Sequence, residues 1–237
     1  QPLEGPFSIQ KESERRLKMH LEPLEPLNLR KCKTVGDIVR GMALCSFGAR
    51  MLGEVAHTTA KLAQGSKKPR IIYDGPRGTA VGYYLRQMVN CGWCEDMLLP
   101  EDYASSNDRK RPLFVVGGFS ERHARAIYET EEKTIFINPY ELAKPGQVRY
   151  GYFPDAVFAD PNFAVPTIFF AVREWLDEGK SDVATFLIEL GRLDGSGPSV
   201  HHGVETLWQM IIDPETTVLM TVSGSMTIAQ MNLVLCD

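Results

Sequence analysis

The apolar positions along the chain follow two alternating patterns. In the first, apolar side chains recur every three or four residues, which predicts amphipathic helices. We expect these helices at residues 35–42, 47–63, 81–88, 166–178 and 204–211. In the second, short apolar runs rich in β-branched residues predict buried strands. We expect these strands at residues 71–73, 97–100, 113–116, 134–137, 157–159 and 216–222, and residues 183–190 fit either a strand or a helix.

Strands and helices alternate along most of the chain, and small residues follow the ends of the strands. This order is typical of an α/β fold, in which helices flank a mostly parallel sheet. We therefore predict a Rossmann-like α/β protein with an N-terminal helical arm. In such sheets, ligands bind at the carboxyl ends of the strands.

The sequence predicts two unequal parts. Residues 1–33 are polar and interrupted by prolines, so we expect an extended arm with a short helix near residues 12–19. Residues 34–237 are expected to form a single α/β nucleotide-binding domain. Thr34 is placed to cap its first helix, with Asp37 completing a capping box. Residues 101–112 are rich in charged side chains and indicate a solvated loop.

The predicted strand at residues 216–222 runs into a small-residue turn, after which a helical pattern begins. A strand that opens directly into a helix leaves the helix's first N–H groups without intrahelical partners. Such groups attract phosphate, and glycine allows close backbone approach. We predict that Ser223, Gly224, Ser225 and Thr227 contact a dinucleotide. The alternative is a tight turn that binds no ligand.

A second turn of this kind follows the strand at residues 71–73 and contains Asp74, Gly75, Arg77 and Thr79. An arginine in this position is suited to pair with a phosphate or a carboxylate through two hydrogen bonds. We predict that these residues contribute to cofactor binding. The alternative is that Arg77 is simply solvated.

A third turn follows the strand at residues 113–116, where Gly117 and Gly118 are predicted cofactor contacts. His123 lies in the first turn of the helix expected next. The dipole there favours a neutral imidazole, so His123 is a candidate general base, although a capped helix with an exposed histidine is the alternative. Asp160 ends another strand at the same edge of the sheet, where a carboxylate can accept from ribose hydroxyls or hold an amine. We assign candidate catalytic roles to His123 and Asp160.

Composition excludes some classes of function. The chain has 237 residues and a formal net charge of −4, so it has no polybasic face for nucleic acid or an anionic membrane. No apolar run is long enough to cross a bilayer. The first residue is Gln1 rather than Met, and the last predicted helix would normally lead to further strands. We therefore expect missing residues or a partner chain to complete the sheet.

Cysteine and histidine positions argue against a metal site. The chain has five cysteines, an odd number in mostly apolar contexts, which favours a reducing, cytoplasmic compartment. Cys91 and Cys94 form a C-x-x-C that follows a predicted helix end, and no second pair completes a zinc site. We therefore expect two buried cysteines around a turn. His201 and His202 are adjacent, so their side chains point in different directions and do not chelate one metal.

Several segments resemble the deoxyhypusine synthase family. Residues 24–54 are similar to that family's entry arm and first helices, and residues 213–231 to its first strand and NAD-contacting turn. Residues 156–168 resemble a late strand whose aspartate lies beside the dinucleotide. Residues 117–123 are a looser match to the family's glycine-rich turn with a nearby histidine. Together these segments cover less than half of the chain.

The resemblance implies an NAD-dependent transferase that moves an aminobutyl group from a polyamine, spermidine, to an acceptor amine such as a protein lysine. It also implies an oligomer, a tetramer in the family, with active sites between subunits. In this chain, however, residues 55–203 separate two segments that nearly adjoin in the family, and no Trp-Gly-Lys motif supplies the imine-forming lysine. The alternatives are a non-catalytic homologue that pairs with an active subunit, or another nucleotide-binding α/β enzyme.

Overall fold

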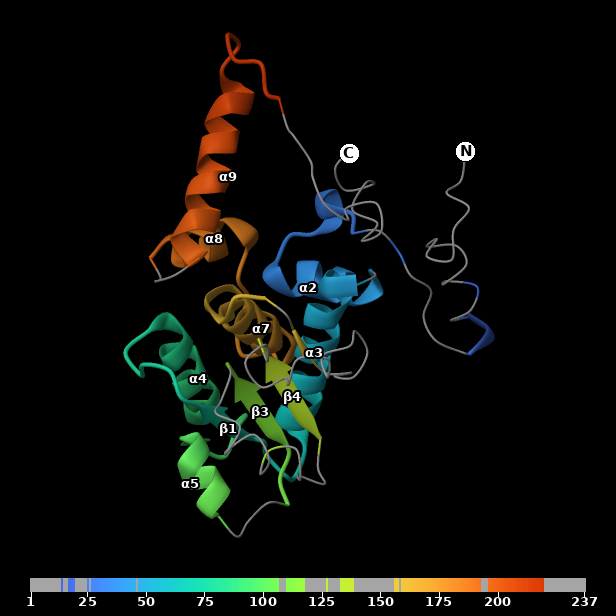
Figure 1. Ribbon diagram of the computed structural model, residues 1–237. Coiled ribbons are helices and arrows are strands. Elements are labelled where there is room, and N and C mark those ends of the chain that lie inside the picture. Colours follow the sequence, from blue (N-terminus) through green and yellow to red (C-terminus); the bar gives the residue numbers. More distant parts are fainter. Residues whose placement is uncertain are drawn as a thin grey trace, which may run out of the picture.

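A five-stranded sheet forms the centre of the computed structural model (Figure 1). The structure describes residues 14, 17–19, 25, 27–45, 47–106, 110–117, 127, 133–138, 156–157, 159–192 and 196–219. The strands are β1 (Arg70–Tyr73), β2 (Met97–Leu98), β3 (Leu113–Val116), β4 (Thr134–Ile137) and β5 (Ala156–Val157). All four pairings between neighbouring strands are parallel, which confirms the predicted α/β class.

The strands lie in the order β2-β1-β3-β4-β5. The chain moves from β1 to β2 on one side and then crosses to β3 on the other, so the order reverses between β1 and β3. The same strand order occurs in flavodoxin-like folds, where ligands bind in the crevice at that reversal. Tyr73, Val116, Ile137 and Val157 are aligned across the sheet, so four of the strands end at the same level.

The described helices are η1 (Leu29–Lys31), α2 (Val35–Leu44), α3 (Phe47–Gln64), α4 (Ala80–Asn90), α5 (Pro100–Ser105), α7 (Pro161–Trp175), α8 (Val183–Gly191) and α9 (Ser196–Ile212). Of these, α3, α4, α5 and α7 contact the strands of the sheet. Helix α7 is the most central, because it contacts α2, α3 and α4 and also reaches β4. Helix α7 has 15 residues and is buried over most of its length, so it lies at the centre of the larger core.

Alternating strand residues build two cores on opposite faces of the sheet, as the period of two along a strand requires. The larger core, shared with α2, α3, α4, α7 and α8, receives Ile71, Tyr73, Phe114, Val116, Ile135 and Ile137. The smaller core receives Ile72, Leu113, Val115 and Phe136, together with Tyr103 and Ile127. Both faces are apolar because a parallel sheet is covered on both sides.

Helix α2 begins as the sequence predicts. The Thr34 hydroxyl accepts a hydrogen bond from the Asp37 N–H at 3.1 Å, and the Asp37 carboxylate accepts from the Thr34 N–H at 3.2 Å, which completes the capping box. Glu174, from the end of α7, adds a contact that the sequence does not reveal. Its carboxylate accepts from the Thr34 hydroxyl at 2.8 Å and from the Gly36 N–H at 3.2 Å.

Three expectations about helices need correction. Residues 101–105, predicted as part of a solvated loop, lie in α5, because Pro100 starts a helical turn and Tyr103 is fully buried beneath it. Helix α7 begins at Pro161, five residues before the predicted start, with Asp160 as its N-cap. Helix α9 begins at Ser196 rather than at residue 204. Residues 183–190, which fitted either a strand or a helix, lie in the helix α8.

The strand predicted at residues 216–222 is not present over the part that the structure describes. Residues 216–219 have no regular secondary structure, and Leu219 is 86% exposed. Helix α9 carries the chain away from the sheet before it reaches these residues (Figure 1). This part of the prediction is therefore wrong. Residues 220–222 lie outside the described part.

Candidate functional site

The carboxyl edge of the sheet gathers residues from widely separated segments. Asp74, Gly117 and Asn138 each follow directly after a strand, and Asp160 follows β5 by three residues. Since β1, β3, β4 and β5 end in register, these residues lie along one edge. The edge is where ligands bind in open parallel sheets.

The turn after β1 is held by hydrogen bonds within itself. The Thr79 hydroxyl donates to the Pro76 carbonyl at 2.7 Å and accepts from the Gly82 N–H at 3.3 Å, so it caps α4. The Tyr73 and Thr79 hydroxyls lie 3.2 Å apart. A Cβ added at Gly75 would collide with the Tyr73 hydroxyl, so a larger residue there requires that side chain to move. Asp74 is exposed at the start of this turn.

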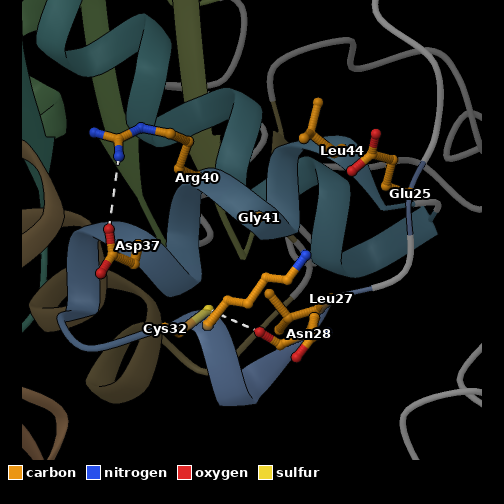
Figure 2. A pocket seen from close by; sticks show the side chains of 9 residues that line it. Glu25, Leu27, Asn28, Cys32, Asp37, Arg40, Gly41 and Leu44 are labelled. Atoms are coloured by element: carbon orange, nitrogen blue, oxygen red, sulfur yellow. Dashed lines mark hydrogen bonds and ion pairs between the residues drawn. The ribbon is translucent and has the colours of Figure 1, made fainter.

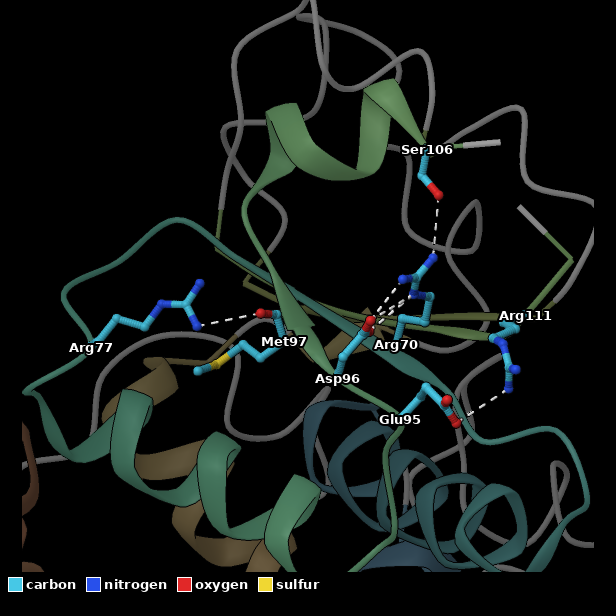
Figure 3. A network of polar contacts seen from close by, with 7 residues as sticks. All are labelled: Arg70, Arg77, Glu95, Asp96, Met97, Ser106 and Arg111. Atoms are coloured by element: carbon cyan, nitrogen blue, oxygen red, sulfur yellow. Dashed lines mark hydrogen bonds and ion pairs between the residues drawn. The ribbon is translucent and has the colours of Figure 1, made fainter. Parts of the chain in front are cut away.

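The same turn packs closely on the first turn of α4. A Cβ at Gly82 would lie 2.7 Å from the Arg77 carbonyl oxygen and 2.9 Å from two other backbone atoms of Arg77. The guanidinium of Arg77 donates to the Met97 carbonyl at 3.4 Å, which directs this side chain toward β2 (Figure 3). By contrast, a Cβ at Gly78 would have no atom within 4 Å, so the turn is open at that position.

Gly117 lies beside this turn, because β3 is the neighbour of β1. Its φ of +85° is a left-handed conformation that favours glycine, and a Cβ there would meet nothing within 4 Å. Its N–H donates to the Ile137 carbonyl at 2.8 Å, and the Asn138 N–H donates to the Val157 carbonyl at 2.7 Å. Asn138 also has a positive φ, 53°, so the backbone turns sharply where it leaves β3 and where it leaves β4.

Asp160 has a structural role that accounts for its position. Its carboxylate accepts from the Asn162 N–H at 2.8 Å and from the Asn162 side-chain amide at 2.9 Å, at the start of α7. The side chain is nevertheless exposed at the sheet edge. It remains accessible to a ligand while it caps the helix.

The structure therefore brings together five of the predicted site residues at the switch point, and Asp160 at the same edge. The five are Asp74, Gly75, Arg77, Thr79 and Gly117. The remaining predicted site residues lie outside the described part of the chain. They are the candidate base His123 and the cofactor contacts Gly118, Ser223, Gly224, Ser225 and Thr227.

At the amino end of β1, a second polar cluster ties strands together. Arg70 forms three hydrogen bonds to the Asp96 carboxylate, the shortest at 2.7 Å, and reaches Ser106 at 3.4 Å (Figure 3). Arg111 pairs with Glu95 at 3.4 Å. Every charged group in this cluster has a partner, and the cluster lies at the end of β1 opposite the candidate site. It therefore holds β1, β2 and α5 together.

A cavity that sequence reasoning missed lies between the N-terminal arm and α2 (Figure 2). Its volume is about 460 Å³, and its charged lining residues are Glu25, Lys31, Asp37 and Arg40. The arm lies against α2 here, since the Glu25 N–H donates to the Leu44 carbonyl at 2.8 Å. The lining mixes both charges in equal number, and the cavity owes its existence to the way the arm crosses α2. No local pattern in the sequence could have revealed it.

The two cysteines of the C-x-x-C segment show no sign of nucleophilic chemistry. Cys94 is buried, as predicted, and burial raises the pKa of its thiol to about 12. Cys91 is exposed rather than buried, and partial desolvation together with Glu178 raises the pKa of its thiol. Both are therefore protonated thiols at neutral pH, which are poor nucleophiles and metal ligands.

Among the described residues, no three histidine, cysteine or acidic side chains are grouped to hold a metal ion. The rings of His201 and His202 are tilted by 59° to each other, and His201 lies 3.7 Å from Glu205. No helix in the described ranges has both the length and the apolar character needed to cross a membrane.

No protein-family model, curated protein or solved structure matches the chain.

Proposed function

We propose that this chain binds a dinucleotide, NAD, at the carboxyl edge of its sheet between β1 and β3. One observation carries the proposal: the strand order reverses between these two strands, and the turn at residues 74–79 and Gly117 lie at that reversal. A crevice forms at such a reversal because the two connections leave the sheet in opposite directions.

The residues at this edge suit the parts of a dinucleotide. The first N–H groups of α4, those of Ala80 and Val81, have no intrahelical acceptor and lie at the positive end of the helix dipole, which favours phosphate. Gly78 and Gly117 leave open space for close approach. Asp74 and Asp160 offer exposed carboxylates for ribose hydroxyls. Because Arg77 is directed toward β2, the phosphate contact in this proposal belongs to backbone N–H groups.

For the activity, we propose the reaction that the family resemblance implies. When bound, NAD would serve first as hydride acceptor and then as hydride donor. Loss of a hydride from the carbon beside an amine of spermidine would leave an imine, which the acceptor amine would attack with release of the remaining diamine. Return of the hydride to the new imine would give the aminobutyl product. In this scheme His123 accepts a proton from the amine, and Asp160 holds the cationic polyamine. Cysteines without disulfides at positions 32, 45, 91 and 94 support a reducing, cytoplasmic setting.

A second candidate is a non-catalytic homologue that pairs with an active subunit. The sequence contains no Trp-Gly-Lys motif, and Lys180, which follows a glycine, is exposed. An imine-forming lysine needs a dry pocket that lowers its pKa, so Lys180 does not suit that role. A third candidate is another nucleotide-binding α/β enzyme, in which the turn after β1 is the main contact.

Calorimetric titration with NAD, with and without spermidine, separates these candidates. Binding with NADH formation supports the transferase, and binding without turnover supports the non-catalytic homologue. Binding of a different nucleotide in place of NAD supports the third candidate. Failure to bind any nucleotide would contradict the assignment of the sheet edge.

A pair of variants tests the location of binding. Gly78→Asp places a negative charge in the open part of the turn, and we expect it to weaken NAD binding at least about tenfold by repelling phosphate. Gly203→Asp adds the same charge at another glycine with no atom within 4 Å of an added Cβ, on α9. We expect this control to bind NAD as the wild type does.

A further inference from the structure

Helix α9 is held to the described part of the molecule near its beginning. Its first turns pack against α8 and α7, and Val200 joins the larger core. From His202 to Ile212 every residue is exposed except Met210, which is half-buried. Figure 1 shows the helix, in orange to red, standing away from the sheet. Because short helices are stabilised mainly by packing of an apolar face, this part of α9 needs a partner.

The exposed part of α9 carries an apolar stripe, formed by Val204, Leu207, Trp208, Ile211 and Ile212. The spacing of these residues places them on one side of the helix. Their exposed fractions are 44%, 47%, 57%, 61% and 51%. Monomeric proteins rarely expose a contiguous apolar surface of this kind, which is typical of an interaction site.

The charges on α9 narrow the choice of partner. Residues 203–212 contain one charged side chain, Glu205, and neither lysine nor arginine, so the stripe offers nothing to a nucleic acid or an anionic membrane. The helix ends differ in polar character: His201 and His202, whose ring N–H groups donate hydrogen bonds, lie near the amino end, and the carboxylates of Asp213 and Glu215 follow the carboxyl end. An antiparallel copy of the same helix complements both the neutral stripe and these donors and acceptors.

We propose that two copies of this chain associate through α9, with the two helices antiparallel across a two-fold axis. Centred near Leu207 and Trp208, this arrangement places Val204 of one copy against Ile211 of its partner. It also places His201 and His202 of each copy near the partner's acidic segment at residues 213–215. The proposal rests on the exposed face of α9 and is independent of the function proposed for the sheet edge.

Sedimentation velocity over a concentration series tests the association. We expect the wild-type chain to convert from one copy to two as its concentration rises. Trp208→Glu removes the largest apolar side chain of the stripe and should raise the dissociation constant of the dimer at least about 30-fold. Thr206→Glu adds the same charge on the opposite side of α9 and should leave the dissociation constant unchanged. Circular dichroism of both variants checks that the body of the protein stays folded.

A charge-pair rescue tests the orientation of the helices. Val204→Lys and Ile211→Glu should each weaken the dimer, and the chain that carries both should regain it, because antiparallel helices bring the two positions together. A wild-type chain that stays monomeric over the whole series, whether or not it binds lipid vesicles, would overturn the proposal. Equal dimerisation of Trp208→Glu and Thr206→Glu would do so too. Failure of the double variant to regain the dimer would overturn the antiparallel arrangement.

Discussion

The carboxylate of Glu174 joins α7 to the first turn of α2. It accepts hydrogen bonds from the Thr34 hydroxyl and the Gly36 N–H, at 2.8 and 3.2 Å. Because the capping box leaves other N–H groups of α2 without acceptors, a carboxylate from a neighbouring helix satisfies one of them and also complements the helix dipole. A single side chain thus couples two helices that lie far apart in the sequence.

Replacing Glu174 by alanine should therefore lower the free energy of unfolding by about 1–2 kcal/mol, the usual cost of losing a helix cap. Urea denaturation followed by circular dichroism measures this change. Glu189→Ala is the matched control, because the ion pair of Glu189 is with Arg192, which is 69% exposed and lies within one helical turn. We expect the control to change stability by less than about 0.5 kcal/mol. Equal effects of the two substitutions would contradict the capping role of Glu174.

Asp37 should make the stability of α2 depend on pH. A hydrogen bond from the Lys33 N–H, helped by Thr34 and Arg40, lowers the pKa of this carboxyl below its usual value and outweighs partial desolvation. A carboxyl whose pKa is lowered by folding stabilises the folded protein at pH values above its usual pKa. This contribution disappears as the pH falls through the folded-state pKa. We expect Asp37→Asn to be less stable than the wild type at pH 6, with a gap that narrows below about pH 4. Urea midpoints at several pH values measure the gap, and a constant gap would contradict the prediction.

At the scale of single residues, local contacts could be predicted from the sequence and distant ones could not. Thr34 and Asp37 are three residues apart, so their capping box follows from a short pattern. Glu174 lies 138 positions from Gly36, and no local pattern links them. Asp160 shows a different difficulty: the sequence places it at the sheet edge but does not reveal that its carboxylate already caps α7.

At the scale of elements, the unit of β1, its turn and α4 depends on close backbone packing. Gly82→Ala would place a Cβ 2.7 Å from the Arg77 carbonyl oxygen, and backbone atoms cannot move aside without shifting the turn. Alanine normally favours a helix over glycine by about 1 kcal/mol, but a clash with backbone costs more. We therefore expect Gly82→Ala to destabilise the protein by about 1–3 kcal/mol and to weaken nucleotide binding at the edge.

Gly78→Ala provides the control in the same turn. A Cβ there meets nothing within 4 Å, and the residue does not have a positive φ. We expect this substitution to leave stability unchanged or to raise it by about 0.5 kcal/mol, because alanine restricts the unfolded chain. Thermal and urea unfolding of both variants check the contrast. If Gly82→Ala were as stable as Gly78→Ala, the turn would not be packed on α4.

Elements with a strong periodic pattern were predicted well, and short or irregular ones were not. The pattern for α3 and the run for β3 give nearly the observed bounds. Helix α5 was missed because six residues are too few for a helical period to show, and two buried residues, Pro100 and Tyr103, hold it in place. The start of α7 was missed because Pro161 and Pro166 suggested a boundary at the second proline, although Pro166 lies inside the helix.

At the scale of the whole molecule, the sequence predicts the class of fold but not the order of its strands. Alternating helices and apolar runs indicate a parallel sheet with two covered faces. The position of β1 between β2 and β3 depends on contacts between distant segments, which no periodicity records. The switch point, and with it the pairing of the turn after β1 with Gly117, therefore becomes visible only in the structure.

The same view of the whole molecule predicts how local stability is distributed. Strands β1 and β3 are hydrogen-bonded on both sides and buried on both faces, so their amides should open only with global unfolding. Residues 202–212 of α9 have few packing contacts and should exchange their amide hydrogens fastest among the described helices. Hydrogen exchange read by mass spectrometry should thus show rapid labelling of α9 in dilute protein. Protection of α9 should increase with protein concentration as two copies associate, while protection of β3 stays the same. Strong protection of α9 at the lowest concentration would mean instead that its apolar stripe is covered within a single chain.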